Sequence, residues 1–278
     1  MPLHRALASL SVITLACAVP ARSQAAAPAA AALLGPADSL IPSGPLGAAI
    51  RRGRALLLAT RDSLPAHVGN SLRCASCHLD AGRRASGSWV GVYTRYPQYR
   101  SRSNSVETIE YRVNDCFRRS MNGRPIAVDG PEMRDIVAYF AFLSRDVPAS
   151  SAAPRRASAW AGRTADTAAG RGVYGAACAR CHGADGDGAA GPPLWGPRSY
   201  NIGAGMARVL TAAAFVKENM PFDAPGSLSD KDALDVAGFV NAHPRPDFPD
   251  KAGDWPNGDA PPDAPYQTAH PAQGASRH

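Results

Sequence analysis

Two C-x-x-C-H motifs constrain this chain more than any other feature of its sequence. In this spacing two thiols reach the two vinyl groups of one porphyrin, and the next residue offers an imidazole to the iron. A redox dithiol would need a thioredoxin-like context, and a zinc site would need a second Cys/His pair nearby; the sequence has neither. We therefore predict two covalently bound haem c groups. Their attachment residues are Cys74, Cys77, His78, Cys178, Cys181 and His182.

The first 25 residues have the pattern of an export signal. A basic start precedes an apolar run over residues 6–18, and small residues surround position 25. No later run approaches the ~20 apolar residues of a membrane helix, so no membrane span is expected. A lipid anchor at Cys17 is not expected either, because Thr14 stands where such signals usually carry leucine. We therefore predict a periplasmic protein with residues 1–25 removed.

The remainder predicts an all-α protein with two cytochrome c-like domains. Residues 26–40 form an Ala/Pro-rich lead that is expected to be disordered. An N-terminal catalytic domain is assigned to residues 41–146, a Pro/Ala/Ser-rich linker to 147–163, and a C-terminal domain to 164–243. Residues 244–278 are rich in proline and lack apolar periodicity, so they are expected to be a surface tail.

Two helices are predicted around the second motif. One starts near Asp166 and carries Gly170 and Tyr174 at four-residue steps, and a closing helix starts at the N-cap Ser229. Glycines on both helices, Gly170 and Gly238, would permit a close crossing.

The axial ligands of the second haem are predicted from two loops. GPPLWG resembles the loop of class I cytochromes c whose proline carbonyl, here Pro192, binds the proximal histidine, here His182. ENMPF resembles their sixth-ligand loop, which makes Met220 the preferred ligand and predicts a raised reduction potential. Met206 and Lys217 are the weaker alternatives, and a methionine can also simply fill a core.

Cys116 is left without a disulfide partner once the motif cysteines bind haem. Residues 103–123 predict a helix capped by Asn104, with Cys116 and Ser120 on one face and Arg112 one turn earlier. The cysteine would then point towards the first haem, where thiolate ligation would lower the potential. An inert buried thiol is the ordinary alternative. Other possible ligands of this haem are Met121 and Met133, whereas His67 is expected on the surface.

The formal net charge of +7 favours an anionic partner. Nucleic acid is not expected, since aromatic residues make up only 7% of the chain and no basic helix stands out. A small anion remains the expected substrate class.

Three segments closely resemble the bacterial dihaem thiosulfate dehydrogenases, c-type cytochromes that couple two thiosulfates to tetrathionate. They are NSLRCASCHLDAG, WVGVYTRYPQYRSRSN and EYRVNDCFRRSMNG, and the likeness runs from about Ile41 to Trp255. The resemblance implies that His78 and Cys116 ligate the catalytic haem. It also implies that the second haem passes electrons to a soluble acceptor, such as a small cytochrome c or a high-potential iron–sulfur protein.

The same resemblance implies that Arg102, Arg112 and Ser120 bind the substrate anion. Joining two dianions requires positive charge, and the candidates for supplying it are Arg100, Arg102, Arg112, Arg118 and Arg119. Some family members exchange a lysine and the adjacent methionine as haem ligands; Asn219 holds the lysine position here, so steady His/Met ligation is expected.

Two alternatives stay open: a non-enzymatic dihaem electron carrier, and a haem subunit of a sulfur-oxidation complex that acts on a carrier protein. The same site could also reduce tetrathionate if the reduction potentials favoured that direction.

Overall fold

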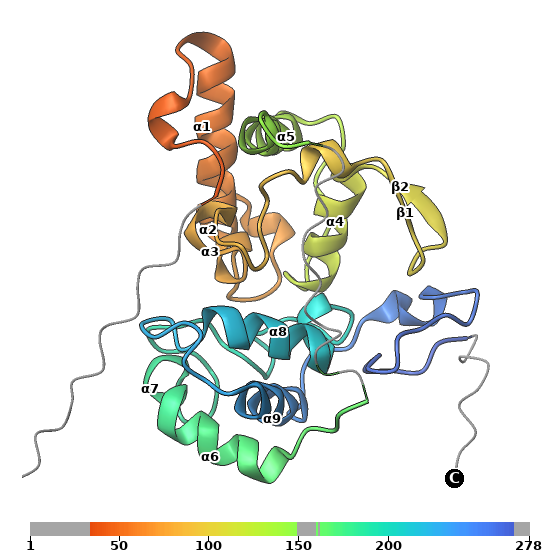
Figure 1. Ribbon diagram of the computed structural model, residues 1–278. Helices are drawn as coiled ribbons and strands as arrows, with labels where there is room; N and C mark the ends of the chain where they lie inside the picture. Colours follow the sequence, from red (N-terminus) through yellow and green to blue (C-terminus); the bar gives the residue numbers. More distant parts are fainter. Residues whose placement is uncertain (1–33, 149–159, 161, 270–278) are drawn as a thin grey trace, which may run out of the picture.

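The computed structural model describes residues 34–148, 160 and 162–269, which form two helical domains packed against each other (Figure 1). The predicted leader and most of the predicted linker lie outside the described residues. Among the described residues, no helix has both the length and the apolar character that a membrane crossing demands.

The N-terminal domain contains five helical segments and one small hairpin. The helices are α1 (Gly44–Leu58), α2 (Thr60–Ser63), α3 (Leu79–Gly82), α4 (Ile109–Arg119) and α5 (Pro131–Ser144). Strands β1 (Gln98–Arg100) and β2 (Ser105–Glu107) pair antiparallel, with Tyr99 opposite Val106. The hairpin is the one departure from the all-α prediction within the described part of the chain. It projects from the domain beside the C-terminal residues (Figure 1).

The C-terminal domain is built from α6 (Thr167–Ala177), α7 (Ala179–His182), α8 (Val209–Asn219) and α9 (Asp230–Asn241). Asp166 caps α6 by accepting hydrogen bonds from two backbone amides, and Ser229 caps α9 through the amide of Asp232. The predicted starts of both helices are therefore confirmed.

Both domains use the same close crossing between their first and last helices. A Cβ on Gly53 of α1 would lie 1.9 Å from the carbonyl oxygen of Asp135 in α5. A Cβ on Gly170 of α6 would lie 2.1 Å from the carbonyl oxygen of Asp235 in α9. The predicted close approach at Gly170 is confirmed, whereas Gly238 faces Ala165, just before α6.

The helix that carries Cys116 begins later than the sequence predicted. Its N-cap is Thr108, whose hydroxyl accepts from the amide of Tyr111, and residues 105–107 belong to β2. Asn104 instead lies in the hairpin turn with a φ of 48°, where its side chain accepts a hydrogen bond from Tyr99. The capping-box pattern was misleading, because asparagine also suits turns with positive φ.

Both ends of the described chain are held by contacts with the rest of the protein, which the composition did not predict. The amide of Leu34 donates to the carbonyl of Arg83, and Asp38 pairs with Arg83 and with Arg54. The lead predicted to be disordered is thus attached from residue 34 onwards. At the other end, Phe248 and Trp255 are buried, so residues 244–269 are more than a surface tail.

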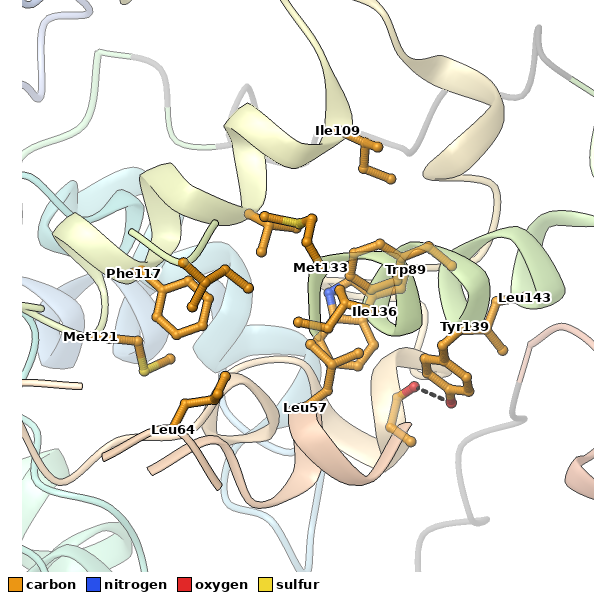
Figure 2. Packing of buried hydrophobic residues seen from close by; sticks show 14 of the residues in the cluster. Leu57, Leu64, Trp89, Ile109, Phe117, Met121, Met133, Ile136, Tyr139 and Leu143 are labelled. Atoms are coloured by element: carbon orange, nitrogen blue, oxygen red, sulfur yellow. Dashed lines mark hydrogen bonds between the residues drawn. The ribbon is translucent and has the colours of Figure 1, made fainter. Parts of the chain in front are cut away.

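The core of the N-terminal domain gathers side chains from α1, α4 and α5 around Trp89 (Figure 2). Phe117 projects from α4 toward this core, and Ile136 projects from α5. The hydroxyl of Tyr139 donates to the carbonyl of Ala81, 2.9 Å away, which satisfies a polar group in an otherwise apolar core.

We predict that Gly170→Ala lowers the free energy of unfolding by about 1–3 kcal/mol, because the new methyl group collides with the backbone of α9. Gly172→Ala is the matched control on the same helix, where no atom lies within 4 Å of the added Cβ. It should be neutral or stabilising by up to about 1 kcal/mol. Thermal unfolding of the two holoproteins measures both effects, and equal melting temperatures would contradict the proposed crossing.

Candidate functional site

The first motif opens into a cavity in the N-terminal domain with about 610 Å³ of empty space. Residues from α1, α4, α5 and the motif line it. The members that carry chemistry are Cys74, Cys77, His78, Cys116, Ser120 and Met121. The predicted attachment residues and the lone cysteine therefore face one space.

The second motif opens into a cavity of about 940 Å³ in the C-terminal domain. It is lined by the motif residues Cys178, Cys181 and His182 and by Met220 from the loop after α8. The two cavities are neighbours, because four residues line both of them: Leu72, Cys77, Tyr200 and Met206.

The two motif histidines are oriented in the same way. Nδ1 of His78 donates to the carbonyl of Gly87 at 2.6 Å, and Nδ1 of His182 donates to the carbonyl of Pro192 at 2.8 Å. The predicted contact of Pro192 is thus confirmed. Burial lowers the pKa of His78 to about 4, so its ring is neutral. Because each Nδ1 is occupied, Nε2 is left as the nitrogen for iron.

The donor set and the linings of the two cavities fit haem c. Each cavity offers two thiols, a neutral imidazole and mostly apolar walls, including Trp89 stacked on His78 with ring centroids 4.8 Å apart. Burial raises the pKa of Cys74 and of Cys77 to about 12 and that of Cys178 to about 11, which indicates water-poor surroundings. Such surroundings suit a porphyrin.

Cys116 lies beside a guanidinium, as its helical spacing predicted. Nη1 of Arg112 donates to the sulfur of Cys116 at 3.1 Å and also contacts Asp115 at 3.2 Å. The charge of Cys116 is the main cause that raises the pKa of Arg112. Ser120 lies one turn further along the chain and lines the same cavity. The pair places a fixed positive charge next to the sulfur.

Arg102 has a different environment from Arg112. Its Nη1 donates to the carbonyl of Gly203 at 2.9 Å, and its guanidinium lies 4.4 Å from the ring centre of Trp255. Nε lies 3.6 Å from a carboxylate oxygen of Asp254. Arg102 is thus held by Gly203, Asp254 and Trp255. Neither Arg102 nor Arg112 belongs to the described lining of the first cavity.

The remaining arginines of the predicted cluster have separate roles. Arg119 is buried and paired with Asp115 and Asp254, so it is structural. Arg118 is half-exposed over the ring of Tyr111. Arg100 lies at the hairpin, 4.0 Å from Glu107.

The alternative ligands differ in how far the geometry supports them. Lys217 donates to the carbonyl of Leu228 at 2.5 Å and is absent from the described lining of the second cavity. Met133 is 1% exposed in the core and is not part of the first cavity's described lining. Met121 lines the first cavity and Met206 lines both, so these two remain geometrically possible.

Sequence reasoning missed several residues around the arginines. Asp254 and Tyr266 had no motif to mark them and lie in the segment expected to be a surface tail. Asp115 stood in a quoted segment, but its ion pairs with Arg112 and Arg119 were not predicted. Trp89 stood in a quoted motif, but its stacking on His78 was not predicted.

Comparison with known proteins finds a cytochrome c domain in each half of the chain. Residues 66–149 match the family model described as "SoxA/TsdA, cytochrome c domain", and residues 165–240 match "Cytochrome C oxidase, cbb3-type, subunit III". The thiosulfate dehydrogenase of Allochromatium vinosum is 45% identical, over 82% of this chain and 89% of that protein. The thiosulfate dehydrogenase of Psychrobacter arcticus is 40% identical, over 82% of this chain and 73% of that protein.

A solved structure of thiosulfate dehydrogenase (TsdBA) from Marichromatium purpuratum matches with a TM-score of 0.72 and 37% identity. It covers 78% of this chain, and this chain spans about half (50%) of that one. The fold and the site define an oxidoreductase of the c-type cytochrome class, with two domains that each bind one haem c covalently. Within that class, the chain belongs to the thiosulfate dehydrogenase family.

We predict that the Cys178→Ala/Cys181→Ala protein carries one covalent haem in place of two, because only the first motif can still form thioether bonds. Intact-mass spectrometry of denatured protein measures this directly. Cys116→Gly is the control and should keep both haems, since Cys116 belongs to neither motif. Loss of a covalent haem from the Cys116 variant would contradict the assignment.

Proposed function

We propose that this protein oxidises two thiosulfate ions to tetrathionate in the bacterial periplasm, releasing two electrons. The observation that carries the proposal is the contact of Arg112 with Cys116: the cysteine lines the first haem cavity, and its sulfur is held beside a cation. The names of the relatives support the substrate, and the leader-like first 25 residues support the location.

In this proposal His78 and Cys116 ligate the first haem, and arginines reduce the repulsion between the two substrate anions. Thiosulfate is a dianion, and two of them repel each other as their terminal sulfur atoms approach. Arg112 and Arg102 would offset that repulsion, and the hydroxyl of Ser120 would donate to an anion oxygen. The haem groups, when bound, would take up the two electrons one at a time.

Electrons would leave through the second haem, with His182 and Met220 as its ligands. Met220 lines the second cavity, and Lys217 is occupied by the carbonyl of Leu228, which supports steady His/Met ligation. The residues shared by both cavities keep the two groups near each other. A small soluble cytochrome c or a high-potential iron–sulfur protein is the proposed acceptor, and the same site would support tetrathionate reduction at suitable potentials.

The competing interpretations fit the site less well. A purely electron-carrying cytochrome has no use for a guanidinium held 3.1 Å from a cysteine sulfur, and the relatives are named as dehydrogenases. A subunit acting on a carrier protein would account for the first domain alone, whereas the likeness to thiosulfate dehydrogenases covers both domains.

We predict that Cys116→Gly abolishes thiosulfate-dependent reduction of an artificial acceptor by the purified protein. Arg112→Gln should lower kcat/KM by about 100-fold or more, the usual cost of removing a charged donor from developing negative charge. Arg118→Gln is the control on the same helix, because its guanidinium stacks on Tyr111 away from the sulfur. Unchanged turnover in the Cys116 variant would show that this residue takes no part in the reaction and would refute the proposal.

We predict that Met220→His lowers the midpoint potential of the second haem, because thioether ligation raises the potential and imidazole does not. The change should be a clear fraction of the ~0.8 V that axial ligands span. Met206→Leu is the control and should leave the midpoint potential of the second haem unchanged. A spectroelectrochemical titration separates the two haems; a shift with the Met206 variant alone would transfer the ligand role to Met206.

A further inference from the structure

The C-terminal residues cross the N-terminal domain where the substrate arginines lie. We call residues 247–266 the C-terminal strap; they run beside the β1–β2 hairpin (Figure 1). The backbone amide of Trp255 donates to the carbonyl of Arg102 at 2.8 Å, and its ring lies under the Arg102 guanidinium. Asn257 donates to Asn104 in the hairpin turn at 3.0 Å. The strap thus holds the segment that carries Arg102 through both backbone and side chains.

Asp254 is the charged centre of the strap. Its two carboxylate oxygens accept from Nη1 and Nη2 of Arg119, both at 2.7 Å, in a bidentate pair. Nε of Arg102 lies 3.6 Å from one of these oxygens, and the hydroxyl of Tyr266 donates to the same oxygen. Asp254 is 4% exposed, so one buried carboxylate contacts two arginines of the N-terminal domain.

From Arg119, further contacts between groups of alternating charge lead to the sulfur of Cys116. Arg119 also binds Asp115 at 2.5 Å, and Asp115 contacts Arg112, the partner of Cys116. Burial lowers the pKa of Arg102, and the charge of Arg119 lowers it further, whereas Tyr266 and Asp254 act in the opposite direction. Without the carboxylate, two buried like charges would face each other and Arg102 would turn towards solvent.

We infer that Asp254 is a positioning residue for the substrate site, fixing the guanidinium of Arg102 in its binding orientation through the C-terminal strap. The inference rests on the proposed function, because it takes Arg102 as a ligand of thiosulfate. Asp254 itself touches no substrate in this account; it acts through Arg102 and Arg119.

The strap also provides a matched control. Asp263 accepts from Arg208 at 2.7 Å and from the amide of Leu210 at 3.0 Å, on the C-terminal domain. Its loss loosens the strap at a point away from Arg102 while removing the same charge. A variant at Asp263 therefore separates general attachment of the strap from control of Arg102.

The experiment compares Asp254→Asn, Asp254→Glu and Asp263→Asn in the full-length holoprotein. We expect Asp254→Asn to raise the KM for thiosulfate by about tenfold and to lower kcat by a smaller factor, because Arg102 loses the orientation in which it binds the anion. Asp254→Glu keeps the charge, so its KM should lie between that of the parent and that of Asp254→Asn. Asp263→Asn should keep the parent KM.

Equilibrium binding supplies a readout apart from turnover. Calorimetric titration of the oxidised holoproteins with tetrathionate should show a dissociation constant about tenfold weaker for Asp254→Asn and unchanged for Asp263→Asn. The visible spectrum confirms that haem ligation is intact, and measurements stay below each variant's melting temperature.

The outcomes separate the two proposals. Unchanged KM and tetrathionate affinity in Asp254→Asn, or an equal loss in Asp263→Asn, would overturn the positioning role. If the parent binds tetrathionate but does not turn over thiosulfate, the proposed function fails. Weaker binding by Asp254→Asn would still support the positioning role in that case.

Discussion

The contact between the Cys116 sulfur and the Arg112 guanidinium is the interaction on which the proposed substrate site depends. Nη1 of Arg112 donates to the Cys116 sulfur, and the same partly exposed guanidinium also pairs with the carboxylate of Asp115. Asp115 in turn forms a second ion pair, with Arg119. Each charged group in this series depends on its neighbour of opposite charge. The set of interacting residues therefore extends well beyond the lining of the first cavity.

The two domains share a frame and differ in what surrounds the iron. Both cross their first and last helices at a glycine, and both hold the motif histidine by a backbone carbonyl. The first domain adds a helix whose cysteine faces the cavity; the second adds a loop that presents Met220. The division of labour that we propose therefore comes from the inserted segments, because the frame itself is neutral between a thiolate and a thioether ligand.

The features that could be predicted from sequence were those set by local chemistry. The haem motifs depend on five consecutive residues, and the caps at Asp166 and Ser229 depend on three or four. Local sequence patterns gave the wrong prediction where one residue type suits two different conformations. Asn104 suited both a helix cap and a turn, and pairing of β1 with β2 decided for the turn. The lead was misjudged because its anchor is an ion pair of Asp38 with Arg83, which composition does not reveal.

The sequence by itself determined the cofactor class, the two helical domains and the facing of Cys116 and Arg112, because these follow from spacing along one motif or one helix. Only the tertiary structure decided that the two haem cavities share Tyr200 and Met206, and that Arg119 is structural. It alone also joined Asp254 to Arg102. These contacts link residues far apart in the chain, and no local pattern encodes which distant carboxylate will be buried against which guanidinium.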